Sequence, residues 1–244
     1  LYRNGLYQGR NGAAVSSLYD VERSEVLRGP QGFLFGRNSV SGAINIITTK
    51  ASTDDVKGYA EVDVGERGVF VFEGAVNVPI NDNFAIRIAG FHTEEDGYLE
   101  NLAGGPDLIS HNNDALRLSL RWETDKLTAD LIFNYDNRDQ FGTVYRATGE
   151  GNAFLNNQTR INGGTLIETS PDGRTVNNNN YPEPFDGGEV FATSLLIDYD
   201  LGWATLSSLT GYKDHTYSYL EEYDGVPTTT FNYGQEQEGQ YFEQ

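Results

Sequence analysis

The chain has 244 residues, contains no cysteine and no methionine, and carries a formal net charge of −19 at pH 7. The lack of cysteine excludes a disulfide framework, a thiolate metal site and a cysteine nucleophile, and the acidic balance argues against a nucleic-acid partner, because phosphate binding needs clustered lysine and arginine. A chain that begins at Leu1 rather than at methionine is expected to be a piece of a longer protein.

The charge is unevenly distributed along the chain. Residues 1–50 hold six basic and three acidic residues, a balance of +3, so residues 51–244 carry the remaining −22. No run of about eighteen apolar residues is present to form a transmembrane helix. Membrane-spanning β-strands give only a weak hydropathy signal, so a membrane location stays open at this point. The change near Lys50 predicts two parts.

The first part ends in a block rich in glycine and proline, between Gly29 and Gly42. At Gly29-Pro30, proline fixes φ and glycine admits backbone conformations that strain other residues, which predicts a tight turn. Residues 43–49 then form an apolar run that predicts a buried strand.

Familiar catalytic and nucleotide-binding motifs do not fit this block. A phosphate-binding loop needs a glycine five residues before its second glycine and a lysine after it, whereas Gln31 and Arg37 stand around Gly36. Ser39 and Ser41 lack the flanking glycines of a nucleophile elbow. The block therefore does not indicate an enzyme.

From about residue 56 the hydrophobic pattern has a period of two, which is typical of strands. In 116–122, for example, leucines and a tryptophan alternate with Arg117, Ser119 and Arg121. We expect the apolar face to meet lipid and the polar face to meet a lumen. The alternation predicts strands at 59–65, 70–78, 84–91, 116–122, 127–135 and 191–201, a seventh at about 203–219 and an eighth that begins near Gly239.

The connections between these strands alternate in length. Residues 79–83, 123–126 and 201–202 form short turns, whereas 93–112 and 139–187 are long and polar. In an up-and-down meander every second connection lies on the same side, so short turns on one side and long loops on the other are typical of an outer-membrane barrel. The connection 65–68 is the exception, because it is short although it lies on the side of the long loops.

Aromatic residues and one histidine stand at notable positions of the predicted strands. Tyrosines and both tryptophans lie near predicted strand ends, as in interfacial aromatic girdles, although ordinary cross-strand packing explains any single one equally well. His92 precedes Glu94, Glu95 and Asp96. This group is more typical of a solvated rim than of a metal site, and no metal site or cofactor is predicted.

The block with Arg28, Gly29, Pro30, Gly36 and Gly42, followed by the apolar run 43–49, has a specific pattern. This pattern resembles the end of the plug domain of TonB-dependent outer-membrane receptors. The resemblance covers about fifty residues, with an upstream plug strand and following helix, and the alternating strands fit the remainder. Ser41 replaces a usual glycine, Phe33 is bulkier than usual, and the TonB-contact motif, which lies further upstream in the family, is absent. The pattern falls on Val26, Arg28, Gly29, Pro30, Phe35, Gly36, Gly42, Ile44, Asn45, Ile46, Thr48 or Thr49, and Lys50.

The resemblance implies an all-β fold: part of a transmembrane antiparallel barrel of about 22 strands, with the C-terminal part of a small α+β plug. Residues 1–50 would be the plug part, 51–55 a linker and 56–244 the first seven to eight barrel strands. Arg23, Arg28 and Arg37 would pair with barrel carboxylates, or else form only surface pairs. The plug-motif residues are Arg28, Gly29, Pro30, Gly36, Arg37, Gly42 and Asn45.

The function that the resemblance implies is TonB-dependent transport of a scarce nutrient, most often a ferric siderophore, across the bacterial outer membrane. Such a receptor breaks no bond in its ligand and is not an enzyme. The implied partners are TonB, a ferric chelate or other nutrient, and outer-membrane lipid, and the ligand-binding residues are not identified. Two alternatives are a soluble extracellular carbohydrate-binding β-sandwich and a small non-energised porin or adhesin.

Overall fold

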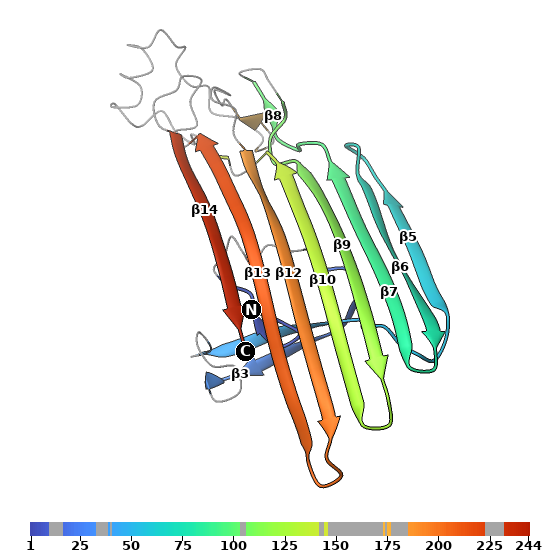
Figure 1. Ribbon diagram of the computed structural model, residues 1–244. Helices are drawn as coiled ribbons and strands as arrows, with labels where there is room; N and C mark the ends of the chain where they lie inside the picture. Colours follow the sequence, from blue (N-terminus) through green and yellow to red (C-terminus); the bar gives the residue numbers. More distant parts are fainter. Residues whose placement is uncertain are drawn as a thin grey trace.

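The computed structural model describes residues 1–9, 17–32, 39, 41–102, 106–141, 144–145, 173, 175–176, 185–222 and 232–244. Its strands form a four-stranded sheet, an eight-stranded sheet and a two-stranded sheet. Figure 1 shows the small four-stranded sheet lying across one face of the large sheet. Among the described residues, no helix has the length and apolar character needed to cross a membrane.

The four-stranded sheet comes from the first part of the chain, and we call it the plug sheet. Its strands are β1 (Tyr2–Arg3), β2 (Leu6–Tyr7), β3 (Val21–Arg28) and β4 (Gly42–Thr48). Their order is β2-β1-β4-β3, and β1 runs parallel to β4. The strand expected at 43–49 is thus β4. The α-helical component expected of the plug falls in part on residues 10–16, which lie outside the described residues.

The second part of the chain forms the eight-stranded sheet, which we call the barrel sheet. Its order is β14-β13-β12-β10-β9-β7-β6-β5, and every neighbouring pair is antiparallel. All eight predicted strands are present and several run beyond the predicted bounds, but the eighth begins at Asn232 and not near Gly239. The strands are β5 (Lys57–Val64), β6 (Phe70–Asn81), β7 (Phe84–Glu95), β9 (His111–Glu123), β10 (Leu127–Gln140), β12 (Phe185–Asp200), β13 (Thr205–Glu222) and β14 (Asn232–Glu243).

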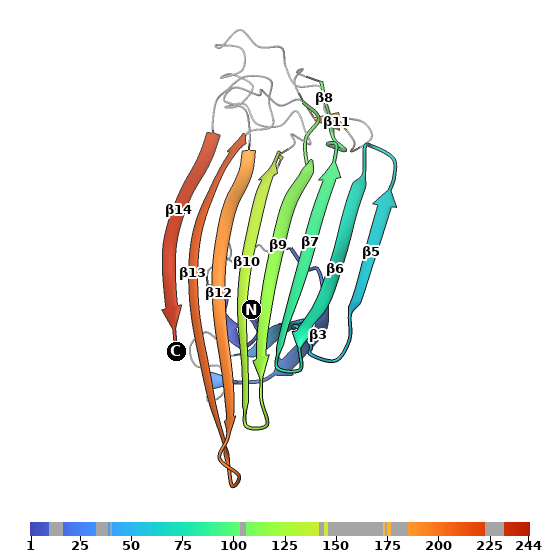
Figure 2. The same ribbon diagram turned by 45° about the vertical axis from the view of Figure 1, so that its right-hand side comes forward.

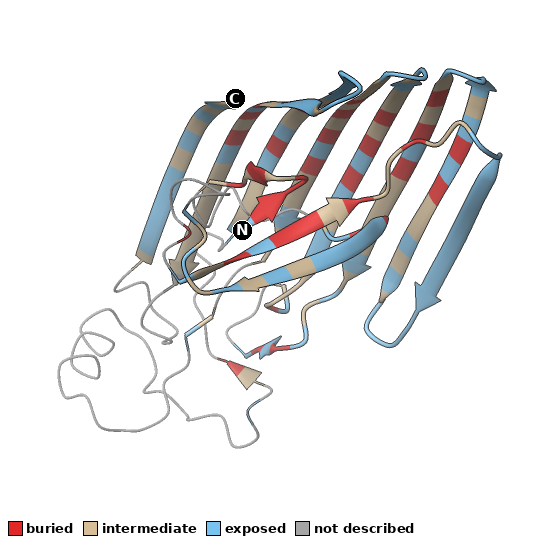
Figure 3. Cartoon of the chain, turned by 90° about the horizontal axis from the view of Figure 1, so that it is seen from below, coloured by how far each residue is buried: buried red, intermediate tan, exposed pale blue. Residues whose placement is uncertain are grey.

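The two faces of the barrel sheet differ as the alternation predicts. Along β9, Leu116 and Trp122 are exposed on the outer face, whereas Arg117 and Ser119 are buried beneath the plug sheet. Side chains alternate across a strand, so the leucines that point away from the plug form an apolar outer surface. Figure 3 shows the curved barrel sheet with the plug sheet against its inner side, and the buried residues of the barrel sheet lie in the strands that the plug sheet covers.

The connections also follow the predicted parity, with the short turns at one end of the sheet and the long connections at the other (Figure 2). At the long-loop end, β8 (Glu100–Asn101) pairs in parallel with β11 (Thr175–Val176). Leu99, Leu108 and Val176 form a buried apolar cluster beside this pair. The sequence did not predict this small sheet, which joins two long connections.

The barrel sheet is open, because β5 and β14 stand at its opposite ends and do not pair with each other. This arrangement excludes the closed small barrel that was one alternative. The outer face is also unsuited to a soluble β-sandwich, since it exposes Leu116, Trp122, Phe191 and Tyr199 to the surroundings. The described architecture is a segment of a larger barrel wall with plug strands on its inner side.

Candidate functional site

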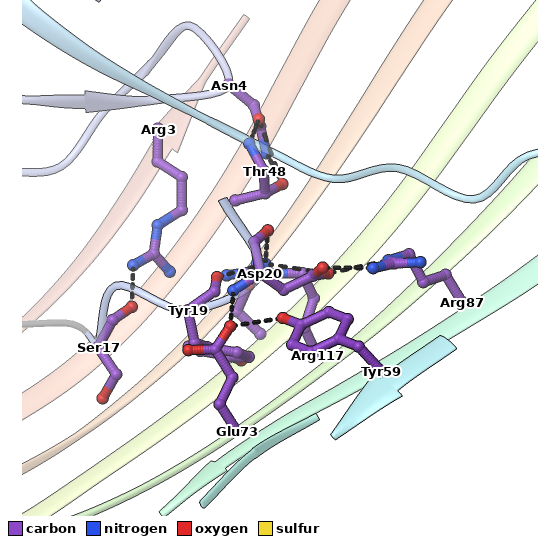
Figure 4. Close-up of polar contacts among 11 residues, drawn as sticks. Arg3, Asn4, Ser17, Tyr19, Asp20, Thr48, Tyr59, Glu73, Arg87 and Arg117 are labelled. Carbon is purple, nitrogen blue, oxygen red and sulfur yellow. Dashed lines mark hydrogen bonds and ion pairs between the residues drawn. The ribbon is translucent and has the colours of Figure 1, made fainter. Parts of the chain in front are cut away.

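The turn just before β3 places the Asp20 side chain against the inner face of the barrel sheet (Figure 4). Its side chain is almost fully buried, and its backbone has a positive φ of 46°. The Nε of Arg87 on β7 donates to Asp20 Oδ2 at 2.9 Å, and Arg87 Nη2 donates to Asp20 Oδ1. Two parallel hydrogen bonds between a guanidinium and a carboxylate fix orientation as well as distance. Asp20 therefore ties the plug to the barrel wall.

Arg117 on β9 binds the backbone of the same turn. It is 1% exposed, and its Nη1 donates to the carbonyl oxygens of Tyr19 and Asp20, each at 3.2 Å. Its Nε donates to Asn134 Oδ1 at 2.8 Å, and its guanidinium carbon lies 4.4 Å from the centroid of the Tyr19 ring. A guanidinium can make these contacts at once because its donors are arranged in a rigid plane.

Neighbouring strands complete the binding of this turn. The Asp20 amide donates to Glu73 Oε1 on β6 at 2.9 Å, and the Tyr59 hydroxyl donates to the same oxygen. The Tyr19 ring stacks on Phe91 with centroids 5.8 Å apart. Burial raises the pKa of the Tyr19 phenol to about 12, so it is neutral at physiological pH. The Tyr19–Asp20 turn thus contacts three adjacent barrel strands, β6, β7 and β9. Tyr59 on β5 and Asn134 on β10 bind the side chains that hold the turn.

A second contact region lies at the other end of the barrel sheet, where β2 meets β13 and β14. The buried Lys213 ammonium donates to the Gln8 carbonyl oxygen at 2.9 Å, and the Tyr7 amide donates to Glu243 Oε2 at 3.0 Å. Leu6 fills the space beside Gly211, where an added Cβ would lie 2.5 Å from its side chain. Glycine at this position lets the plug approach the wall.

Two further cations of the first part meet barrel carboxylates. Arg3 Nη1 lies 3.7 Å from Asp136 Oδ2, and Lys50 Nζ lies 3.0 Å from Asp130 Oδ2. Asp130 also accepts two hydrogen bonds from Arg121. The plug thus supplies both cations and an anion to these contacts. Some barrel carboxylates pair with plug cations, while Arg87 and Arg117 bind the plug's Asp20.

The plug-motif residues lie mainly within the plug sheet rather than at the barrel wall. Gly29 and Gly42 flank the connection between β3 and β4 with φ of 84° and 153°, and Pro30 follows Gly29. Asn45 lies on β4, donates to Glu25 Oε2 at 3.1 Å and accepts from the Gly5 amide at 3.1 Å. These contacts join the strands of the plug sheet. Gly36 and Arg37 lie outside the described residues.

The expected pairing of Arg23 and Arg28 with barrel carboxylates is not observed. Arg23 pairs with Glu22 and Glu25 on its own strand, at the surface. Arg28 is exposed and forms no ion pair with any described residue. β3 is the edge strand of the plug sheet, so it lies away from the described barrel strands. The contacts fall instead to the preceding turn and to β1.

Sequence reasoning missed the Asp20 site. One signal was available, since Arg87 and Arg117 stand on the polar face of otherwise apolar strands, and a buried charge needs a partner. What the sequence does not indicate is which carboxylate that partner is.

At the long-loop end, an open pocket of about 510 Å³ lies between the rims of β7, β9 and β10. Its lining includes Glu95, Asp107, His111 and Phe141. His92 on β7 does not line this pocket and contacts Asp114 on β9 through Nδ1 at 2.8 Å. The described residues contain no group of three or more His, Asp or Glu side chains arranged to hold a metal ion.

No family model matches the chain. Among curated proteins, the pesticin receptors of Yersinia enterocolitica and Yersinia pestis are 33% identical to it over 94 residues, which is 38% of this chain and 14% of theirs. The chain therefore matches only a small part of their length.

Solved structures share the fold. The ferric yersiniabactin uptake receptor FyuA of Yersinia pestis matches with a TM-score of 0.73 and 21% identity, over 90% of this chain and 32% of that one. The ferripyoverdine receptor of the Pseudomonas aeruginosa outer membrane matches with a TM-score of 0.74 and 16% identity, over 98% and 31%. The siderophore receptor PiuA of Acinetobacter baumannii gives 0.69 and 17%, over 90% and 29%.

All of these proteins are receptors rather than enzymes, and this chain spans about a third of the solved ones. Its plug motif, its sequence match to the pesticin receptors and its shared plug-and-barrel fold agree with one another. The chain is therefore similar in sequence to part of the pesticin receptors, and it shares the plug-and-barrel fold of the outer-membrane siderophore receptors.

Proposed function

We propose that the protein containing this chain takes up a ferric chelate, such as a siderophore, across the outer membrane in a TonB-dependent manner. The observation that carries the proposal is the plug sheet, which lies across the inner face of the barrel sheet and is joined to it by buried polar contacts such as Asp20–Arg87. A plug held inside the wall blocks the lumen, so passage of a ligand requires work on the plug.

The ligand class is supported by the structures that share the fold, because one is named as a ferric yersiniabactin uptake receptor and another as a receptor bound to ferripyoverdine. The long-loop end would face the outside, as in outer-membrane barrels generally. The ligand would enter there and TonB would act from the other side.

We also propose the domain organisation: residues 1–50 as the plug part, 51–55 as a linker and 56–244 as barrel. Within the plug part, Arg28, Gly29, Pro30, Gly36, Arg37, Gly42 and Asn45 would act as the structural motif that shapes the plug.

The test uses the full-length receptor in a host that lacks its own iron receptors. Cells are given radioactive iron as a panel of ferric chelates, with and without TonB. We expect at least one chelate to enter only when both the receptor and TonB are present. Uptake that is independent of TonB, or no uptake of any ferric chelate by a correctly assembled receptor, would contradict the proposal.

A further inference from the structure

On the inner face of β13 and β14, plug-contacting residues give way to tyrosines towards the long-loop end. Lys213 on β13 contacts the plug, and the following inward positions are His215, Tyr217 and Tyr219. At about 3.3 Å per residue, Tyr217 and Tyr219 lie roughly 13 and 20 Å from Lys213 towards the long-loop end. They therefore face the lumen beyond the described plug contacts.

These tyrosines form a continuous aromatic surface with β14. The rings of Tyr217 and Tyr219 lie 5.6 Å apart at 40°, and those of Tyr219 and Tyr233 lie 5.8 Å apart at 52°. Tyr233 is 52% exposed. Tyrosine offers a flat, half-polar contact surface with few rotatable bonds, which suits it to binding. We call Tyr217, Tyr219 and Tyr233 the tyrosine wall.

Arg138 on β10 extends this wall across a glycine. Cross-strand pairing aligns Arg138 with Gly188 and Gly188 with Tyr217. The Arg138 guanidinium carbon lies 5.4 Å from the Tyr217 ring centroid, although β12 separates their two strands. Arg138 is also paired with Asp186, so its charge is neutralised by a neighbouring carboxylate.

The charges around the tyrosine wall select against an anionic ligand. Its cation, Arg138, already has a carboxylate partner, and Glu221 adds a negative charge beside Tyr219. Two amides stand opposite the tyrosines of β13: Gln237 pairs in register with Tyr217, and Gln235 accepts a hydrogen bond from the Tyr219 hydroxyl at 3.3 Å. Rings, a hydroxyl and an amide bind flat uncharged groups better than carboxylates or phosphates.

We infer that the tyrosine wall is a binding subsite for a flat aromatic group of an uncharged ferric chelate. The inference rests on the proposed uptake function and specifies which part of the ligand this segment of the barrel contacts. Aromatic pairs contribute through offset or edge-to-face contact, with ring centroids about 4.5–7 Å apart. The ligand's ring would extend the existing stack of Tyr217, Tyr219 and Tyr233.

The test compares two neutral probes, ferric tris(tropolonate), which carries flat aromatic rings, and ferric tris(acetohydroxamate), which carries none. Binding to the purified full-length receptor in detergent is measured by equilibrium dialysis with radioactive iron, against detergent alone. We expect the tropolonate complex to bind about fivefold more tightly or better, and Tyr219→Leu to remove most of that preference. Tyr135→Leu, on the outer face, is the matched control and should retain it.

Tyr219→Phe keeps the ring and removes only the hydroxyl, so it should keep the preference even if Tyr219→Leu fails to assemble. Equal binding of the two probes by the unaltered receptor overturns the inference. A folded Tyr219→Phe receptor that loses the preference, or a folded Tyr219→Leu receptor that retains it, also overturns it. Cellular uptake separates the two proposals. TonB-dependent uptake without any ring preference contradicts the proposed subsite but not the proposed function. Ring-selective binding without uptake contradicts the proposed function but not the subsite.

Discussion

Asp20 and Arg87 are 67 residues apart in the chain, yet they form a buried, two-point ion pair between the plug sheet and the barrel sheet. Arg117 approaches the same carboxylate to 3.8 Å. One acidic side chain thus connects the turn before β3 to two barrel strands.

Replacing Asp20 should weaken the attachment of the plug. Removing one partner of a buried pair typically costs about 3–5 kcal/mol, so Asp20→Asn should make the plug easier to unfold or digest. The measurement is protease sensitivity and denaturant unfolding of the full-length receptor in detergent. Glu22→Gln, which removes an exposed partner of Arg23, is the control and should leave stability nearly unchanged, because water screens an exposed pair. Equal effects of the two changes would contradict the role of Asp20.

The two motif glycines should differ in their tolerance of alanine. Both have positive φ, but an added Cβ at Gly42 would lie 2.6 Å from the Leu27 carbonyl oxygen, whereas nothing lies within 4 Å at Gly29. Gly29→Ala should cost about 1–2 kcal/mol from backbone strain alone, and Gly42→Ala should cost more because β3 must also move. Unfolding of the plug, monitored by the same digestion, ranks the two. A ranking in the opposite order would refute this account.

A charge placed on the outer face should impair assembly more than one on the lumen face. Leu118→Arg puts a cation towards the hydrocarbon, which costs about 2–4 kcal/mol at the bilayer midplane. Thr93→Arg places the same charge on the inner face of β7. Folded receptor is quantified by heat-modifiable migration in outer-membrane fractions. Ser119 is a poor control, because it is buried beneath the plug and paired with Arg87 in register. Similar folded yields for the Leu118 and Thr93 variants would argue against a lipid-facing outer surface.

The small sheet at the long-loop end should depend on its apolar cluster. Val176 is 1% exposed, so Val176→Asp buries an unpaired carboxylate and should separate β11 from β8. Leu102→Asp, at an exposed position in the same region, should be tolerated. Limited proteolysis of intact cells reports on the outer connections, while heat-modifiable migration reports on the barrel. We expect only the Val176 variant to become more sensitive to protease, with the barrel intact in both.

The strands and their faces could be predicted because one physical pattern dictates them. Alternation such as Leu116–Arg117–Leu118–Ser119 places apolar groups on one face and polar groups on the other. The starts of β12 and β14 differ most from the prediction, because apolar and polar residues alternate poorly towards the long-loop end, as at Gly187 and Gly188. β8 and β11 have two residues each, too few for any periodicity to appear.

The plug contacts could be predicted in kind but not in detail. Arginines on a lumen face imply buried partners, and the excess of barrel acids suggested that plug cations would supply the pairing. Arg3 and Lys50 do so. The pairing of Asp20 with Arg87 depends on how the plug sheet docks, which local sequence does not encode. The position of β3 at the sheet edge likewise explains why Arg23 and Arg28 do not reach the described wall.

The polar nature of the plug contacts also bears on repeated use. Where the Tyr19–Asp20 turn meets the wall, the apolar contribution comes mainly from Tyr19, Phe91 and three alanines, Ala75, Ala89 and Ala115. Most of what would be uncovered if this turn left the wall is therefore readily wetted: Arg87, Arg117 and Glu73 can exchange their partners for water. Separation would expose little apolar surface, and the attraction between Asp20 and the two arginines would favour return of the turn to the same position. A contact made in this way can open and close many times without aggregation.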